Sequence, residues 1–301
     1  PVLVSAWLRT WPSRAQACVV AHARNHRGMP SVPTVALAHP ARLGEGPLWS
    51  PRERRLWWID IRGRAVHAYD PATGNDRCYP MPSEPGMVAL RSGGLLVALR
   101  DGLHALDPQS GALNPLGLTH QHGTGFRFND GACDAAGRLW VGTLSDAERE
   151  PLAHLYCIDA GGCRRVLDGL TVSNGIGWSP DGATMYLIDS PTRRVDAFTF
   201  DCATGTIAQH RTAVVFPTEL GFPDGLAVDA EGMIWVGMWG GWRVQRCDPA
   251  NGRLLEHLAL PVERVSACAF AGDDLRDLYI TTVEAEPAQL SGQPLAGFLF
   301  K

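Results

Sequence analysis

The feature that most constrains the fold is a pattern of strands that occurs six times along the chain. In each unit one short apolar strand is followed by a second, which in most units ends in a turn containing Asp and Gly. The units are, in order, LWWID with AVHAYDPATG, LLVALR with LHALDPQSG, RLWVGTL with HLYCIDAGG, TMYLIDS with VDAFTFDCATG, MIWVGMW with RVQRCDPANG, and LYITTV with GFLF. A repeat of this kind predicts an array of similar β units.

The spacing of the units indicates how many strands each contains. Their turn aspartates lie between 37 and 52 residues apart: Asp70, Asp107, Asp159, Asp201 and Asp248. Four-stranded propeller blades repeat about every 40–50 residues. Each unit is preceded by a further apolar strand, and the longer connections leave room for a fourth, outer strand. We therefore predict an all-β fold, a six-bladed β-propeller. A β-sandwich is the alternative, but it does not account for the period.

The repeats also suggest a domain organisation. Residues 32–301 are predicted to form a single six-bladed propeller domain. The alternating segment Val32–Ala38 is expected to pair with the last blade and close the ring, because closure removes exposed strand edges. Residues 1–31 contain no Asp or Glu but four Arg. We interpret them as an N-terminal extension of uncertain order, either a weakly transit-like segment or an upstream addition.

Composition excludes several classes of function. The chain of 301 residues has a net charge of −4 and a pI of about 6.2, so no basic field favours nucleic acid. No stretch approaches the roughly 18 apolar residues that a membrane span needs. The eight cysteines lack C-x-x-C spacing and are expected to be reduced thiols. We expect a cytoplasmic monomer or weak oligomer with neither nucleic-acid nor membrane partners.

One position of the repeat is occupied by a residue with a carboxylate or amide oxygen in four of the six units. It is the residue just before the small residue that opens the first strand: Glu45-Gly46, Pro85-Gly86, Asp130-Gly131, Asn174-Gly175, Asp224-Gly225 and Ser266-Ala267. The first strand of each propeller blade lines the central channel, so equivalent positions converge on the axis. Carboxylate and amide oxygens there suit Ca²⁺, Mg²⁺ or Mn²⁺, and also Zn²⁺. The pattern predicts an axial divalent-metal site; ordinary Asp-Gly and Asn-Gly turns are the alternative.

Several segments resemble the regucalcin (senescence marker protein)/gluconolactonase family of sugar lactonases. They are LGEGPLWSPRERRLWWIDI, FRFNDGACDAAGRLWVGTL, SNGIGWSPDGATMYLIDS, FPDGLAVDAEGMIWVGMWGG and QPLAGFLF. The resemblance implies a six-bladed propeller that binds one divalent cation through Glu45, Asn174 and Asp224. It also implies that Arg127 and Asn129 bind the sugar lactone. Repeat register alone selects Asp130 as a fourth ligand, one residue away from Asn129.

The family often has an acidic residue soon after the G-T-M turn that touches the substrate. The corresponding run here is GTLSDAERE, in which Asp146 is the expected substrate-binding residue and Glu148 the alternative. The resemblance also implies a reaction, the metal-dependent hydrolysis of an aldonolactone to the aldonic acid. In it the cation acts as a Lewis acid and Asp224 as the general base.

Two other functions use the same fold. One is a metal-dependent hydrolase of aryl esters, organophosphates or other lactones, and the other is a non-catalytic calcium-binding propeller. The chain contains no G-x-S-x-G, H-E-x-x-H, P-loop or G-x-G-x-x-G motif. Serine hydrolases, zincins and nucleotide-binding enzymes are therefore not indicated.

Overall fold

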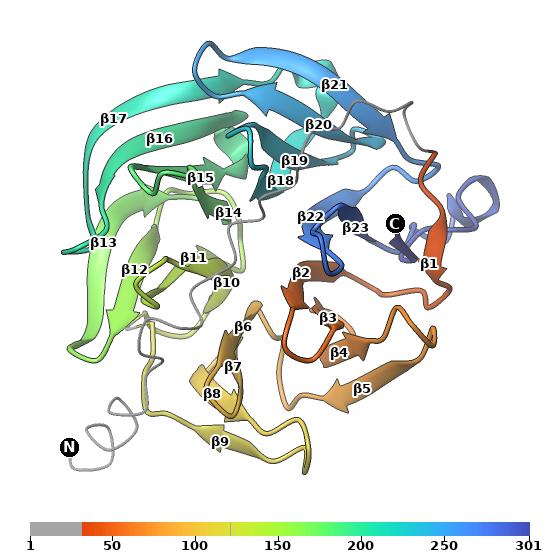
Figure 1. The fold of residues 1–301 in the computed structure, drawn as a ribbon, viewed down its shortest axis with the longest axis horizontal. Coiled ribbons are helices and arrows are strands. Elements are labelled where there is room, and N and C mark those ends of the chain that lie inside the picture. Colours follow the sequence, from red (N-terminus) through yellow and green to blue (C-terminus); the bar gives the residue numbers. More distant parts are fainter. Residues whose placement is uncertain (1–31, 121) are drawn as a thin grey trace.

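Six four-stranded antiparallel sheets surround a central axis, which confirms the predicted six-bladed propeller (Figure 1). The structure is a computed structural model that describes residues 32–120 and 122–301. In the first five blades the strand that comes first in the sequence lies at the centre of the ring, and the later strands lie progressively outward (Figure 1). Cys18 and the rest of the predicted N-terminal extension fall outside the described residues. The seven described cysteines are all free thiols.

The blades follow one another along the chain, and their strands are given from the inside outward. Blade 1 contains β2 (Gly44–Ser50), β3 (Arg55–Asp60), β4 (Ala65–Tyr69) and β5 (Asp76–Pro80). Blade 2 contains β6 (Met87–Arg91), β7 (Gly94–Leu99), β8 (Gly102–Leu106) and β9 (Leu113–Pro115). Blade 3 contains β10 (Phe126–Cys133), β11 (Leu139–Ser145), β12 (Ala153–Asp159) and β13 (Gly162–Leu170).

Blade 4 contains β14 (Ser173–Trp178), β15 (Thr184–Asp189), β16 (Arg194–Asp201) and β17 (Thr206–Val215). Blade 5 contains β18 (Phe222–Val228), β19 (Ile234–Trp239), β20 (Arg243–Asp248) and β21 (Arg253–Ala259). Blade 6 contains β22 (Val265–Ala271), β23 (Asp277–Thr282), β24 (Leu299–Phe300) and β1 (Val35–Leu37). Helical structure in the described residues is limited to three 3₁₀ turns: η1 (Ser190–Thr192), η2 (Thr218–Leu220) and η3 (Leu290–Gly292). Within that part of the chain, no helix has the length and apolar character needed to cross a membrane.

The ring is closed by the first and last strands, as the alternation of residues 32–38 predicts. Strand β1 is the outer strand of blade 6 and pairs with β24, with Val35 opposite Phe300. Beyond the strands, Thr34 and Lys301 exchange two backbone hydrogen bonds of 2.8 Å each. The strand is shorter than the predicted segment, because only residues 35–37 have ladder partners.

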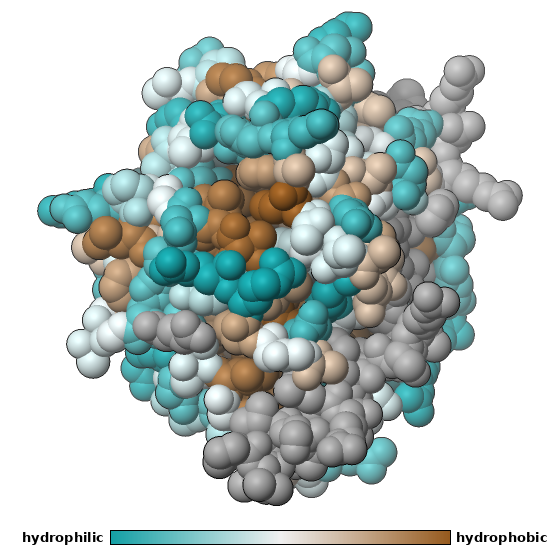
Figure 2. All heavy atoms as spheres, turned by 90° about the vertical axis from the view of Figure 1, so that its left-hand side faces the viewer, coloured by the Kyte–Doolittle hydropathy of each residue, from teal (hydrophilic) through white to brown (hydrophobic). Residues whose placement is uncertain are grey.

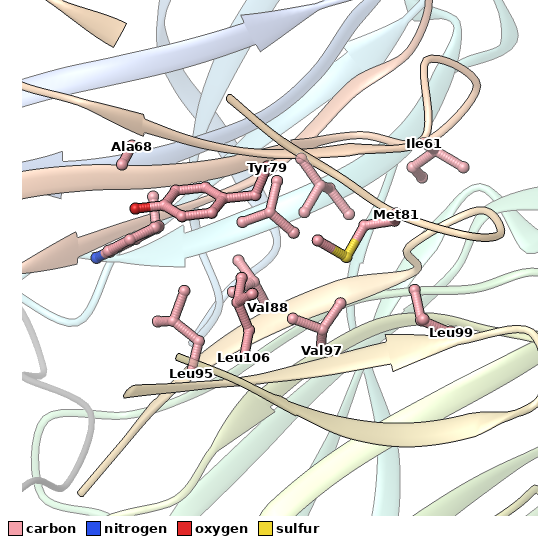
Figure 3. Close-up of a cluster of buried hydrophobic side chains, with 12 residues drawn as sticks. Ile61, Ala68, Tyr79, Met81, Val88, Leu95, Val97, Leu99 and Leu106 are labelled. Carbon is pink, nitrogen blue, oxygen red and sulfur yellow. The ribbon is translucent and has the colours of Figure 1, made fainter. Parts of the chain in front are cut away.

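Hydrophobic contacts between neighbouring blades make up the core. Between blades 1 and 2, Tyr79 and Met81 face Val88 and Val97 across the gap (Figure 3). All four side chains are buried. The outermost strands are more polar, and most residues of β17 are exposed. Figure 2 looks onto the side of the ring where β13 and β17 lie and shows hydrophilic residues bordering an apolar patch. Each blade therefore depends on its neighbours for burial of its apolar faces.

Five of the six inner strands carry one extra residue relative to the second strand of their blade. In β2, Glu45 pairs with Ile59 but Leu48 pairs with Trp57, so three steps on one strand oppose two on the other. Strands β10, β14, β18 and β22 shift register at the equivalent place. Strand β6 of blade 2 pairs regularly throughout. Such β-bulges locally redirect side chains and are common beside functional sites.

The position of the Glu-Gly, Asp-Gly and Asn-Gly pairs in the strands tests whether they are ordinary turns. Glu45, Asp130, Asn174 and Asp224 all lie inside inner strands, so the turn interpretation is wrong for them. Three of the four glycines that follow these residues, Gly131, Gly175 and Gly225, allow close approach of a neighbouring strand. A Cβ at Gly175 would lie only 2.8 Å from the carbonyl oxygen of Asp224 in the next blade.

Gly86 provides a test of this packing at blade 2, which supplies no predicted cation ligand. A Cβ at this position would lie 2.2 Å from the carbonyl oxygen of Phe128 in blade 3. Gly86→Ala is expected to lower the free energy of unfolding by about 1–3 kcal/mol, the usual cost of overpacking. The control is Gly292→Ala, because a Cβ there meets nothing within 4 Å. Equal urea midpoints for the two variants would contradict the close-packing explanation.

Candidate functional site

The predicted site residues come from inner strands of four blades and are largely withdrawn from solvent. Glu45 lies on β2, Asn129 on β10, Asn174 on β14 and Asp224 on β18, and each side chain is between 6% and 8% exposed. Charged and amide side chains are rarely buried to this extent unless they are paired or bind a ligand. The partners of these groups therefore define the chemistry of the site.

A chain of hydrogen bonds links three of these blades. Arg127 donates from Nη1 to Asn129 Oδ1 at 2.6 Å, and Asn129 donates from Nδ2 to Asn174 Oδ1 at 2.8 Å. Asn174 in turn donates from Nδ2 to Ser190 Oγ at 2.7 Å. The Ser190 hydroxyl donates to the carbonyl oxygen of Pro223, also at 2.7 Å. The Arg127 guanidinium can only donate and the Pro223 carbonyl can only accept, so the direction of every bond between them is set. The orientations of both amides follow from it.

Three carboxyl groups in the same region have raised pKa values. Burial raises the pKa of Glu45 to about 8, and the nearby charge of Asp130 adds to the effect. Burial also raises the pKa of Asp130 to about 6. The pKa of Asp224 lies well above its usual value because of burial and because Glu45 and Asp130 are close. Three buried carboxylates can be ionised together only if a positive charge compensates them.

The donors fit a hard divalent cation. Carboxylate and amide oxygens are the ligands that such ions prefer, and the Asn174 amide is held with its nitrogen on Ser190 and its oxygen on the opposite side. Among the described residues no group of three or more His, Cys, Asp or Glu side chains is arranged to hold a metal. The predicted set of two carboxylates and one amide is of a different kind, and it stays a prediction.

The predicted substrate-binding residues differ in their exposure and in their partners. Arg127 donates to Asn129 and, from the same nitrogen, to the carbonyl oxygen of Phe128 at 3.1 Å. Asp146 is exposed and binds Arg100 of blade 2 through both carboxylate oxygens, at 2.9 and 3.0 Å. Glu148, two residues further, raises the pKa of Asp224 and opposes the lowering of the Arg127 pKa that burial causes. The structure thus couples Glu148 electrostatically to the site and joins Asp146 to the neighbouring blade.

The channel continues beyond the site towards the opposite face of the ring. A cavity of about 1150 Å³ is lined by the later residues of the inner strands, mostly apolar ones, among them Leu48, Ala89, Ile176, Leu226 and Ala269. Asp130 is the acidic residue of the site that lines this cavity. Asp130 therefore lies between the buried carboxyl cluster and the far end of the channel.

Ser190 was not predicted to belong to the site. It follows Asp189 at the end of β15 and is the first residue of η1. The residue that follows the corresponding strand of blade 1 is Ile61, so a serine here is a departure from the apolar residue of the first repeat. This substitution of a polar for an apolar residue is the one sequence signal that points to Ser190.

Comparisons with known proteins give a consistent result. The family described as "SMP-30/Gluconolactonase/LRE-like region" matches residues 43–284. Regucalcin of Gallus gallus is 34% identical over 270 residues, which cover 86% of this chain and 90% of that protein. A Bacillus subtilis protein, provisionally named a sugar lactone lactonase, is 34% identical over 264 residues, with the same two coverages.

A solved structure extends the similarity to three dimensions. Regucalcin of Agrobacterium tumefaciens, which is described as a calcium-binding protein, superposes with a TM-score of 0.85 at 28% identity. The match covers 90% of this chain and 92% of that one. The matched region includes every predicted site residue, from Glu45 to Asp224. The chain belongs to the SMP-30/gluconolactonase/LRE-like family.

Proposed function

We propose that this protein hydrolyses a sugar lactone to the corresponding aldonic acid, with one divalent cation held by Glu45, Asn174 and Asp224. The observation that carries the proposal is the meeting of buried carboxyl groups and a fixed amide oxygen from separate blades next to the Arg127–Asn129 pair. Family membership supports it, because the family name includes gluconolactonase. The neighbouring regucalcin structure, described as calcium-binding, supports a divalent cation. Ca²⁺, Mg²⁺, Mn²⁺ and Zn²⁺ are the candidates.

A cation bound there would polarise the lactone carbonyl and stabilise the negative charge that develops on its oxygen. Asp224 is suited to remove the proton from the attacking water, because a carboxylate that contacts both the cation and the water can orient the water and accept its proton. When the ester bond breaks, the ring oxygen leaves as a hydroxyl and the carbonyl carbon becomes a carboxylate. A proton is released in each turnover, so proton release measures the rate.

The hydrogen bonds restrict how Arg127 and Asn129 can hold a sugar. Both hydrogens of Asn129 Nδ2 are in use, one on Asn174 Oδ1 and one on the carbonyl oxygen of Ser173. Asn129 can therefore only accept a hydrogen bond from the substrate, through its Oδ1. Arg127 uses Nη1 for its protein contacts, which leaves Nε and Nη2 as donors to sugar hydroxyls. The pair thus offers donors and an acceptor side by side, a pattern that suits a sugar with adjacent hydroxyls.

The direct test is an assay of five- and six-carbon aldonolactones with a pH indicator. We expect hydrolysis above the spontaneous rate with at least one of the four cations, and its loss after exhaustive chelation. The control is the uncatalysed rate in the same buffer with the chelator. Full activity after chelation would refute the metal mechanism. Faster turnover of simple aryl esters would favour the ester hydrolase, and cation binding without turnover the calcium-binding propeller.

The raised pKa values predict how pH affects the metal-free protein. Glu45 keeps its proton up to about pH 8 in the folded state but releases it near 4.5 when unfolded. The folded state therefore binds more protons between these limits, and its stability should fall as pH rises through them. Saturating cation should remove this loss of stability at higher pH, because the bound cation compensates the negative charges of the carboxylates. Thermal midpoints from pH 5 to 8, with chelator and with cation, measure the effect; parallel profiles would contradict the cation site. Glu45→Gln should flatten the chelated profile.

Kinetics should separate the roles of the base and the substrate-binding arginine. Asp224→Asn keeps the shape and one oxygen but removes the base, so kcat should fall by at least roughly 100-fold at saturating cation. Arg127→Ala removes donors to the sugar and should act chiefly on kcat/KM, with cation affinity nearly unchanged. Cation occupancy is measured on the same samples. If Arg127→Ala abolishes cation binding or leaves the kinetics unaltered, Arg127 is a structural residue.

A further inference from the structure

The carbonyl group just before each predicted cation ligand accepts a hydrogen bond from a buried side chain of the preceding blade. Ser266 Oγ of blade 6 donates to the carbonyl oxygen of Gly44, before Glu45, at 2.6 Å. Asn129 Nδ2 of blade 3 donates to that of Ser173, before Asn174, at 2.8 Å. Ser190 Oγ of blade 4 donates to that of Pro223, before Asp224, at 2.7 Å. The same contact therefore occurs at all three ligand positions.

The β-bulges explain what this contact does. In the strands that carry Asn174 and Asp224 the register shifts just before the ligand, after Ser173 and after Pro223. In the strand that carries Glu45 the register shifts directly after the ligand. A bulge disrupts the ladder locally, so strand pairing within the blade does not fix the peptide of the ligand on its own. A hydrogen bond from the neighbouring blade provides the missing constraint. Blade 2, which supplies no predicted ligand, has a regular inner strand.

Ser190 acts on two predicted ligands. A hydroxyl has one hydrogen, and Ser190 donates it to Pro223, so its oxygen accepts from Asn174 Nδ2. This contact holds the amide nitrogen of Asn174 against Ser190, so that its Oδ1 faces away from Ser190. Loss of the hydroxyl would leave the bond from Asn129 Nδ2 as the remaining contact that orients this amide, and it would release the backbone before Asp224.

Ser266 acts in the same way on Glu45. Its side chain is fully buried, and its oxygen also lies 3.0 Å from Thr281 Oγ1, which is itself buried. The Ser266 hydroxyl lies within donating distance of both Thr281 Oγ1 and the Gly44 carbonyl oxygen, and the contact with Gly44 is the shorter; Thr281 itself donates to the carbonyl oxygen of Ala267 at 3.3 Å. The blade 6 residue that occupies the ligand position of the repeat thus contacts the backbone beside a ligand of blade 1.

We propose that Ser190 and Ser266 are positioning residues for the cation site, which set the places of Asp224 and Asn174 and of Glu45, respectively. The inference rests on the cation site of the proposed function. Residues that orient metal ligands typically alter metal affinity by roughly 10- to 100-fold when they are removed. Ser190→Ala should weaken cation binding more than Ser266→Ala, because it affects two ligands.

The experiment is a calorimetric titration of the metal-stripped full chain with Ca²⁺ and with Mn²⁺. The variants are Ser190→Ala and Ser266→Ala, and circular dichroism checks that each is folded. Ser179→Ala is the matched control: Ser179 is also a buried serine of blade 4, and its hydroxyl accepts a 2.9 Å bond from Thr184 N in a turn outside the site. The control should lower the thermal midpoint and leave the Kd unchanged.

The expected result is a Kd raised by at least tenfold for a folded Ser190→Ala or Ser266→Ala protein, with Ser179→Ala within twofold of the parent. If the parent binds a cation and both variants bind it equally well, the positioning role is wrong and the cation site stands. If the parent binds neither ion, the titration is repeated with Mg²⁺ and Zn²⁺; a parent that binds none of the four cations lacks the cation site of the proposed function, and the positioning role fails with it. A raised Kd in Ser179→Ala as well would mean that the effect is a general loss of stability, which also overturns the positioning role.

Discussion

The like charges of Glu45, Asp130 and Asp224 are the constraint on which the centre of this ring depends. Inner strands of different blades bring these carboxyls together in a buried channel, and their raised pKa values show the cost of doing so. Partly buried Arg127 is the cation that lowers the pKa of Glu45, and it is already bound to Asn129. Hydrogen bonds to backbone and amides, rather than ion pairs, therefore hold the site in place.

The overall fold could be predicted because a blade is a local structure. Its strands follow one another in sequence, and the recurring turn aspartates mark them. The details of the inner strands could not be predicted in the same way, since a bulge is a relation between two strands. The family resemblance selected Asn129 and the repeat register selected Asp130. In the structure Asn129 donates a hydrogen bond to Asn174, whereas Asp130 lines the cavity. The one-residue bulge of β10 lies at Asn129 and Asp130.

Contacts between blades limited what could be predicted about the site. The expectation for Asp146 came from its position after a turn, but its carboxylate lies on Arg100, a residue of another blade that no pattern connects with it. Ser190 is a single polar residue at a position where the repeats do not agree, and its proposed role follows only from its contacts with Asn174 and Pro223. Residues that point along the axis share a repeat position and can be found from it. Residues that join one blade to the next do not share one.

The closure of the ring has a consequence for how the chain folds. Blades 1 to 5 each consist of consecutive strands, so their contacts are local and the entropic cost of forming each is small. Blade 6 is different, because β1 must find β24, and the Thr34–Lys301 contact spans 267 residues. Contacts of such long sequence separation slow folding. Formation of blade 6 is therefore the step that closes the row of blades into a ring. Before this step the edge of β24 is unpaired and can bind the β1 strand of another copy.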